Sequence, residues 1–326
     1  MNFSWDQMRH PIVALSPMAD MTDSPFCRIV KTMAHPIIFR EMISSEAIMR
    51  GNKKTVEMTD IHESEHPIIQ QIFGSDPKIM AEAAHWIVEE KQPDGIDINM
   101  GCPARKIISN FNGSALMKDP ETAAAIVQAV VKAVSVPVSV KMRTGWSDPN
   151  ECLTFAKIIE EAGAHLISIH GRTQAQGYAG LARRDVIAQV KANAKIPILY
   201  NGDIQSAEDF FKAIEETGCD GALIGRGALG NPWIFQEIES RLRGESITAA
   251  DTQERFRVIR AHLDLHLTQY GERAIPSFRK HLLQYLKGLP EAKSWRMKLV
   301  EAKTKEEIHG MLGAYQASLD LEAKAQ

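Results

Sequence analysis

The stretch GIDINMGCPARK, residues 95–106, places a thiol where enzymes often carry reactive groups. The apolar run from Ile96 to Met100 predicts a buried strand, and Cys102 follows it between Gly101 and Pro103. Reactive side chains concentrate on loops that a rigid scaffold holds in place. We therefore expect Cys102 to take part in chemistry, although its position alone does not decide between a nucleophile and a proton donor.

Polar clusters stand at the ends of all the predicted strands, the Cys102 cluster among them. The clusters are PMAD (17–20), REM (40–42), Gln71, NMGC (99–102), KMR (141–143), HGR (170–172), NGD (201–203) and GRG (225–227). Lys141 stands between apolar neighbours, where a lysine is costly to bury without an anionic partner. With His170 on the next predicted strand, it would suit a ring system that gains negative charge on reduction. A lysine that merely extends to the rim of the fold is the alternative.

The NGD and GRG clusters predict a phosphate site. They follow the last two predicted strands, where backbone N–H groups of barrel enzymes commonly bind phosphate, and Arg226 adds a charged donor. Residues 225–230 also match the dinucleotide pattern GxGxxG, but no further strand follows them, so the required context is missing.

A second literal motif, HESEH at residues 62–66, matches the zinc pattern HExxH. Zinc binding needs both histidines on one continuing helix, whereas Pro67 disfavours helical geometry at His66. We expect no metal site there.

The pattern of apolar runs along the chain predicts the fold that holds these residues in place. Eight short apolar runs alternate with amphipathic helical segments such as DPKIMAEAAHWIVEEK, which indicates parallel strands joined by crossover helices. Eight such units favour an α/β fold, a (β/α)8 TIM barrel, over a doubly wound sheet. We predict the barrel over residues 1–245 and an all-helical domain over residues 246–326, where no further strand pattern appears.

Composition narrows the class of protein. The chain has 326 residues, 44% hydrophobic content and a net charge of −3, so a nucleic-acid partner would need a local basic patch. Nine Lys or Arg against two acids between Arg273 and Lys305 provide one. Four cysteines without a CxxC pair, no signal-peptide pattern and no long apolar stretch predict a cytoplasmic protein with no membrane span. No obligate protein partner is evident.

The motifs together resemble the tRNA-dihydrouridine synthase family, with the bacterial B-type (NifR3-like) subgroup the most similar. The resemblance is carried by PMADMTD, QIFG, DINMGCPARK, GSALM, VKMRTGW, IHGRT, NGDI, IGRGALGNPWIF and FRKHLLQYLKG, from Pro11 to the C-terminal helices.

The resemblance implies an FMN-bearing barrel and a helical domain that hold tRNA and reduce a uridine to 5,6-dihydrouridine, with NADPH or NADH as reductant. Hydride would pass from flavin N5 to uracil C6, and Cys102 would donate the proton to C5. The implied cofactor-binding residues are Pro17, Met18, Ala19, Gln71, Lys141, His170, Asn201, Gly202, Asp203, Gly225 and Arg226. The implied substrate or RNA contacts are Asn99, Arg105, Lys106, Arg143, Arg172, Arg279 and Lys280.

One position departs from the family pattern: Asp20 stands where the family usually has glycine. Two other functions stay open. A flavin barrel of the dihydroorotate-dehydrogenase type would act on a free small molecule and would have no use for the basic helical region. A non-catalytic tRNA-binding chaperone would have little need for Lys141 and the phosphate loops.

Overall fold

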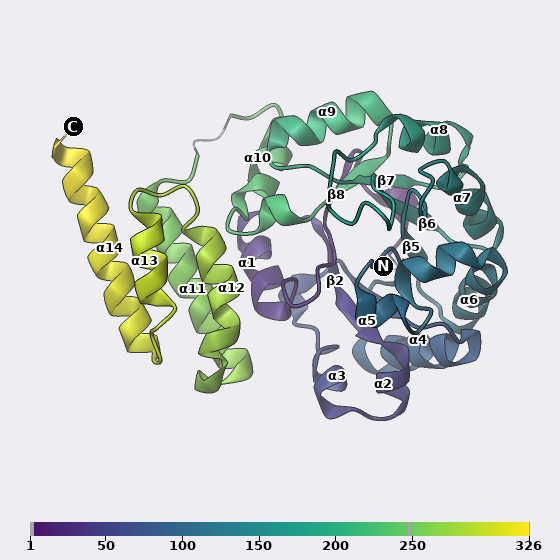
Figure 1. Cartoon of the computed structure of the whole chain (residues 1–326), viewed down its shortest axis with the longest axis horizontal. Coiled ribbons are helices and arrows are strands. Elements are labelled where there is room, and N and C mark those ends of the chain that lie inside the picture. The colour runs from purple at the N-terminus through teal and green to yellow at the C-terminus, as the bar shows by residue number, and fades with distance from the viewer. Residues whose placement is uncertain (1–2, 247–248, 326) are drawn as a thin grey trace. The chain divides into compact units, whose positions relative to one another are not determined.

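The computed structural model describes residues 3–246 and 249–325. Within these residues, eight parallel strands close a barrel in the order of the sequence, so the predicted TIM barrel is confirmed (Figure 1). The strands are β1 (Ile12–Leu15), β2 (Ile37–Ser44), β3 (Ile68–Phe73), β4 (Gly95–Met100), β5 (Val138–Arg143), β6 (Leu166–His170), β7 (Ile198–Asn201) and β8 (Gly221–Ile224).

Helices lie between the strands along the chain (Figure 1). They are α1 (Ser24–Met33), α2 (Ser45–Met49), α3 (Lys53–Glu57), α4 (Pro77–Lys91), α5 (Arg105–Ile108), α6 (Pro120–Ala133), α7 (Glu151–Glu161), α8 (Asp185–Asn193) and α9 (Ala207–Thr217). Local signals fix several starts: Asp76 accepts hydrogen bonds from the amides of Lys78 and Ile79, and Ser206 forms a capping box with Asp209.

Apolar side chains fill the barrel because its strands are buried on both faces. One core cluster joins Ile12, Ala14, Ile37, Phe39, Ile69, Leu166, Leu199 and Leu223 to Trp5. Trp5 belongs to a short 3-10 turn, Trp5–Gln7, that precedes β1. The filled interior leaves the carboxyl ends of the strands and the loops after them as the place for polar chemistry.

The chain divides into two compact units. The first comprises Met1–Ser24 and Pro36–Arg226, and the second comprises Pro25–His35 and Gly227–Gln326. The helix α1, which follows the first barrel strand, therefore lies almost wholly in the second unit. The predicted division after residue 245 stays a prediction.

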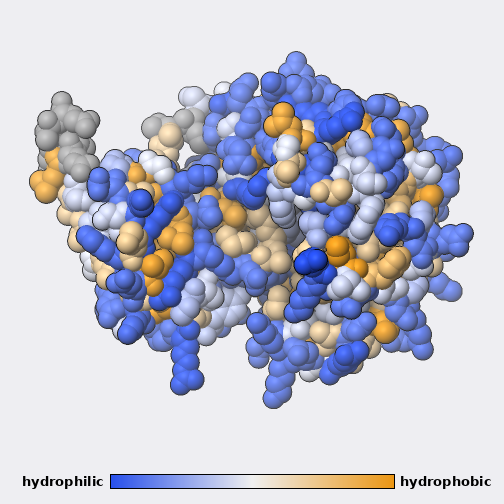
Figure 2. All heavy atoms as spheres, in the orientation of Figure 1, coloured by the Kyte–Doolittle hydropathy of each residue, from blue (hydrophilic) through white to orange (hydrophobic). Residues whose placement is uncertain are grey.

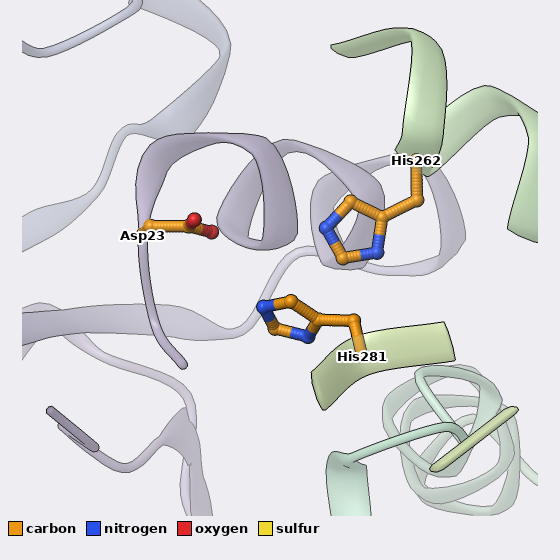
Figure 3. Close-up of side chains that lie close together, drawn as sticks. All are labelled: Asp23, His262 and His281. Atoms are coloured by element: carbon orange, nitrogen blue, oxygen red, sulfur yellow. The ribbon is translucent and has the colours of Figure 1, made fainter. Parts of the chain in front are cut away.

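The second unit is helical and has its own core. Its further helices are α10 (Trp233–Leu242), α11 (Thr252–Tyr270), α12 (Ile275–Tyr285), α13 (Ala292–Leu299) and α14 (Lys305–Ala325). Ile29 of α1 packs in one cluster with residues of these helices, among them Phe256, Phe278 and Tyr315. Buried histidines also contribute, because the rings of His262 and His281 lie side by side with their centroids 4.6 Å apart (Figure 3).

Hydrophilic residues cover most of the face visible in Figure 2, and apolar residues appear there in small separate groups. In the described part of the chain, no helix combines the length and apolarity needed to cross a membrane.

Candidate active site at the carboxyl ends of the strands

Strand register brings the predicted site residues to one rim of the barrel. Asn99 on β4 is paired with Lys141 on β5, and His170 on β6 is paired with both Arg143 and Asn201. Each lies at or near the carboxyl end of its strand. Parallel strands in a closed barrel present these ends at the same face, where barrel enzymes place their active sites.

The loop after β4 holds Cys102 in a defined position. The Cys102 amide donates to Asn99 Oδ1 at 2.9 Å, and the Cys102 carbonyl accepts from the hydroxyl of Ser114 at 2.9 Å. Gly113, at φ +61°, passes so close that an added Cβ would lie 2.9 Å from the Cys102 carbonyl oxygen. Burial raises the pKa of the Cys102 thiol, so the thiol stays protonated at neutral pH.

A buried chain of amides runs from this loop to a carboxylate that sequence reasoning missed. Asn99 Nδ2 donates to Gln71 Oε1 at 2.8 Å, and Gln71 Nε2 donates to Asp97 Oδ2 at 2.6 Å. The other Asp97 oxygen accepts from Ser139 Oγ at 2.6 Å. Asp97 and Ser139 stand two positions before Asn99 and Lys141 on their strands, so a strand period of two could have indicated them.

Lys141 reaches across the rim. Its Nζ donates to Asn201 Oδ1 at 2.9 Å, which ties β5 to β7. Burial, helped by the positive charge of Arg143, lowers the pKa of Lys141 to about 8 against the opposing effect of the Asp97 carboxylate. A lysine with this pKa is still mostly charged at neutral pH and can stabilise negative charge on a bound group.

His170 is held neutral. Burial is the main reason that its pKa lies well below 6.5, and the positive charges of Lys141, Arg143 and Arg172 add to the effect. A neutral imidazole can pack against an aromatic ring or accept a hydrogen bond without adding charge.

The loops after β7 and β8 carry unused backbone donors. Within residues 3–246 and 249–325, no backbone carbonyl accepts a hydrogen bond from the N–H groups of Asp203, Gly225 or Arg226. Arg226 lies near them and is half exposed, at 52% of its side chain. Gly202 has to be glycine, because an added Cβ would lie 2.6 Å from Ala182 Cβ. Free N–H groups beside an arginine suit an anionic ligand such as phosphate.

The Asp203 carboxylate binds protein groups. Arg172 Nη2 lies 2.7 Å from Asp203 Oδ1, and the amide of Ala182 donates to Asp203 Oδ2 at 2.8 Å. Partial burial opposes ionisation of Asp203, but these hydrogen bonds and the arginine charge lower its pKa overall. If Asp203 contacts a phosphate, its backbone N–H is therefore the group available to do so.

Arg143 and Arg172, both expected to contact substrate, are almost fully buried, at 2% and 3% exposure. Arg143 donates to the carbonyls of Gly101, Thr173 and Gly177 at 2.7–2.9 Å. Arg172 donates to Gly180 and to Asp203. These contacts favour a positioning role, in which the two guanidinium groups fix the loop after β6 against its neighbours.

The loop after β6 also exposes an aromatic ring that the sequence did not single out. Tyr178 is 62% exposed, and the guanidinium carbons of Arg143 and Arg226 lie 5.6 and 5.0 Å from its ring centre. An exposed ring between two cations at the rim can stack on a planar ligand.

The first loop, Pro17 to Ala19, closes on itself. The amide of Met18 donates to the hydroxyl of Thr22 at 2.9 Å, and the amides of Met21 and Thr22 both donate to the Met18 carbonyl. Asp20 is exposed and has φ +61°, and its amide donates to Glu41 Oε2 at 2.7 Å. Glycine adopts this left-handed backbone without strain, and aspartate tolerates it better than most other side chains.

The remaining predicted RNA contacts fall in two places. Arg105 and Lys106 are exposed on α5, immediately after the Cys102 loop. Arg279 and Lys280 are half-buried on α12 of the second unit, where Arg279 Nη2 donates to the carbonyl of Ala302 at 3.1 Å. The HESEH stretch forms one 3-10 turn, Glu63–Glu65, capped by His62, and a cis peptide bond joins His66 to Pro67.

The rim thus combines a protonated thiol, a charged lysine, a neutral histidine and two loops with backbone N–H groups left unpaired among the described residues, at the mouth of an eight-stranded parallel barrel. These features suit a barrel site for an anionic, ring-bearing ligand. The model of the dihydrouridine synthase family matches residues 13–320, and the chain belongs to that family.

Curated relatives agree with this assignment. The chain is 43% identical over 286 residues to tRNA-dihydrouridine synthase B of Pseudomonas aeruginosa, covering 86% of each chain. It is 42% identical over 291 residues to tRNA-dihydrouridine synthase B of Pseudomonas syringae pv. tomato, covering 88% of this chain and 86% of the relative. It is 38% identical over 288 residues to a probable tRNA-dihydrouridine synthase of Rickettsia conorii, covering 87% of each. The predicted family and its B-type subgroup are therefore confirmed.

Solved structures with little sequence identity share the barrel. Histamine dehydrogenase from Rhizobium sp. 4-9 matches with a TM-score of 0.56 and 10% identity, over 90% of this chain and 63% of that one. The old yellow enzyme homologue from Zymomonas mobilis matches with a TM-score of 0.52 and 12% identity, over 76% of this chain and 94% of that one. At this identity the likeness shows the fold alone.

Proposed function

We propose that this protein reduces a uridine of tRNA to 5,6-dihydrouridine, using FMN held at the barrel rim and NADPH or NADH as the source of electrons. Family membership supports the substrate class. The observation that carries the proposal is a thiol kept protonated by burial, on a loop whose Cys102 backbone N–H is held by Asn99, on the same rim as a charged lysine.

The residues present fit a phosphate-bearing flavin. The free N–H groups after β7 and β8, together with Arg226, suit the phosphate. Lys141 and Gln71 lie at the rim where the ring edge would be, and Pro17, Met18 and Ala19 form the loop above β1. Once bound, the flavin supplies the reducing electrons for the C5–C6 double bond of uracil.

The protein's own residues orient the base and supply the proton. Asn99 Nδ2 donates to Gln71 at 2.8 Å and, at 3.4 Å, to the sulfur of Met42. Asn99 can therefore hydrogen-bond the edge of uracil by giving up the weaker contact with Met42. Cys102 holds a proton on Sγ and donates it to C5 as negative charge develops there. Lys141 stabilises negative charge on the cofactor side of the same site.

The RNA has to present its base to this site. A uridine inside a stacked loop has to leave its stack to reach the rim. Arg105 and Lys106 are exposed beside the Cys102 loop and can contact phosphates there, as Arg279 and Lys280 can on α12.

Two measurements test the proposal. The purified protein is expected to carry flavin absorption bands and to release FMN on denaturation. Unmodified tRNA incubated with the protein and NADPH is expected to gain dihydrouridine, detected by nucleoside mass spectrometry. A colourless protein that cannot be loaded with FMN would exclude the proposal. Turnover of a free pyrimidine without any on tRNA would favour the small-molecule alternative.

A further inference from the structure

The hydrogen bonds that link the Cys102 backbone to Asp97 all run in one direction, from donor to acceptor toward Asp97. Cys102 N–H donates to Asn99, Asn99 donates to Gln71, and Gln71 donates to Asp97. The Ser139 hydroxyl donates to Asp97 as well. An ionised carboxylate can only accept hydrogen bonds, so Asp97 determines which end of each amide faces which neighbour.

Asp97 is fully buried, with 0% exposure. Its two hydrogen-bond donors are buried as well, Ser139 at 0% and Gln71 at 1% exposure. A buried carboxylate is costly unless hydrogen bonds or an opposite charge compensate it. Asp97 has hydrogen bonds and an opposite charge. Its register partner on the adjacent strand is Ser139, and Lys141 stands two residues beyond Ser139 on that strand.

Lys141 has few other sources of negative charge. Among the residues that the structure describes, the charged or titratable groups that shift the pKa of Lys141 are the cationic Arg143, the carboxylate of Asp97 and the thiol of Cys102. Nearby His170 is neutral. With a protonated thiol, Asp97 supplies the only negative charge among these groups.

We propose that Asp97 is a positioning residue, at once the counter-charge of Lys141 and the terminal acceptor of the hydrogen-bond chain that begins at the Cys102 backbone. The inference rests on the proposed function and extends it, because one carboxylate then governs both the residue facing the cofactor and the loop carrying the acid. Asp97 is fully buried, and its carboxylate oxygens accept from Gln71 and Ser139. It acts through Lys141, Gln71 and Asn99.

The substitution Asp97→Asn separates charge from hydrogen bonding. Asparagine can accept from Gln71 through Oδ1 and donate to Ser139 through Nδ2, so the direction of the chain survives while the charge is removed. Asp220→Asn is the matched control, because Asp220 is a partly buried, ion-paired aspartate that precedes β8 at the amino end of the strands.

The primary readout is the pKa of Lys141, followed by NMR of isotope-labelled lysine side chains in flavin-free protein. The wild-type pKa is about 8. We expect Asp97→Asn to lower it by about one unit or more, which is tenfold in the protonation equilibrium, and Asp220→Asn to leave it unchanged. An unchanged Lys141 pKa in Asp97→Asn would overturn the proposal.

The enzyme's pH profile provides a second readout. Activity that needs charged Lys141 falls as pH rises through the Lys141 pKa, so in Asp97→Asn this alkaline fall should begin at lower pH. A merely structural role would lower activity equally at every pH, and that result would also overturn the proposal.

The wild-type protein alone keeps the inference testable if Asp97→Asn does not fold. Burial raises the pKa of Asp97 to about 6, so the Asp97 carboxyl carbon should titrate there and be ionised at pH 7. An Asp97 that is still protonated at pH 8 could not serve as a counter-charge. Because these titrations use flavin-free protein, their failure is distinguishable from a failure to form dihydrouridine.

Discussion

Burial gives the Cys102 thiol a raised pKa, which separates it from nucleophilic cysteines, whose pKa is lowered by their surroundings. Lys141 and Arg143 act in the opposite direction on the thiol, yet burial prevails. A general acid needs its proton when charge develops, and this thiol keeps its proton throughout the neutral range. The electrostatics of the loop therefore favour the proton-donor role over the nucleophilic one.

We predict that Cys102→Ala binds FMN as the wild-type protein does but forms dihydrouridine at least about 100-fold more slowly, because the proton donor is gone. Flavin fluorescence measures binding, and mass spectrometry of tRNA nucleosides measures product. Cys219→Ala, which removes a buried thiol before β8, is the control and should keep wild-type turnover. Equal turnover in Cys102→Ala would remove Cys102 from the mechanism.

The left-handed backbone at Asp20 leads to a second prediction at this scale. Asp20→Gly should change the free energy of unfolding by less than about 1 kcal/mol, since glycine adopts φ +61° without strain. Asp20→Val should cost about 1–2 kcal/mol more, because a β-branched side chain clashes in this conformation. Urea unfolding of both variants measures the difference, and equal stability would contradict the strain argument.

Two buried arginines show how elements, and not only single side chains, build the rim. Arg143 connects the loop after β4 to the loop after β6, and Arg172 connects the loop after β6 to Asp203 after β7. The loops after three strands are thus joined at the carboxyl ends of the barrel. Positioning contacts of this kind keep a site in a defined geometry before substrate arrives.

Asp203→Asn should lower the free energy of unfolding by about 1–3 kcal/mol at pH 7, because buried Arg172 then has no ionised partner at this position. The folded pKa of Asp203 is lowered, so the ion pair stabilises the protein above the unfolded pKa and this stabilisation disappears as pH falls through the folded pKa. The difference in free energy of unfolding between Asp203→Asn and the wild-type protein should therefore shrink below about pH 4.

Urea unfolding at pH 7 and at pH values down to about 3 measures both effects. The matched control, Glu161→Gln, breaks an exposed pair with Lys157 and should cost less than about 0.5 kcal/mol. A gap that does not depend on pH would mean that the charge of Asp203 is not the stabilising feature.

The barrel itself was predictable because short apolar runs that end in polar clusters mark parallel strands. Sequence also indicated Cys102 and Lys141, whose residue types are unusual in their positions. It did not distinguish Arg143 and Arg172, which are buried, from Arg105 and Lys106, which are exposed. That difference depends on how the loop after β6 folds back, which is a tertiary property that no local pattern carries.

At the scale of the whole molecule, charge is unevenly distributed. Lys287 and Lys293 belong to the basic segment between Arg273 and Lys305 and are both exposed. In the part of the chain that the structure describes, neither ammonium group lies within ion-pair distance of a carboxylate, whereas Lys305 pairs with Asp264. Exposed cations without partners are the groups that release counterions when they meet a phosphate backbone.

We predict that Lys287→Gln combined with Lys293→Gln weakens tRNA binding and lowers the slope of log K against log salt by up to about 2, because each lysine that neutralises a phosphate adds roughly one unit to the slope. Filter binding or fluorescence anisotropy across a salt series measures both quantities. Lys195→Gln, just before β7, is the control and should leave the slope unchanged. A double variant with wild-type slope would exclude these lysines from the RNA interface.

The membership of α1 in the second unit affects any attempt to exchange parts between relatives. A chimera joined near residue 246 would transfer most of the helical unit but leave behind residues 25–35, including Ile29 of its core. Such a hybrid would combine α1 from one parent with a helical core adapted to another. A hybrid should therefore fold stably only when α1 is exchanged together with the C-terminal helices, as a two-segment graft.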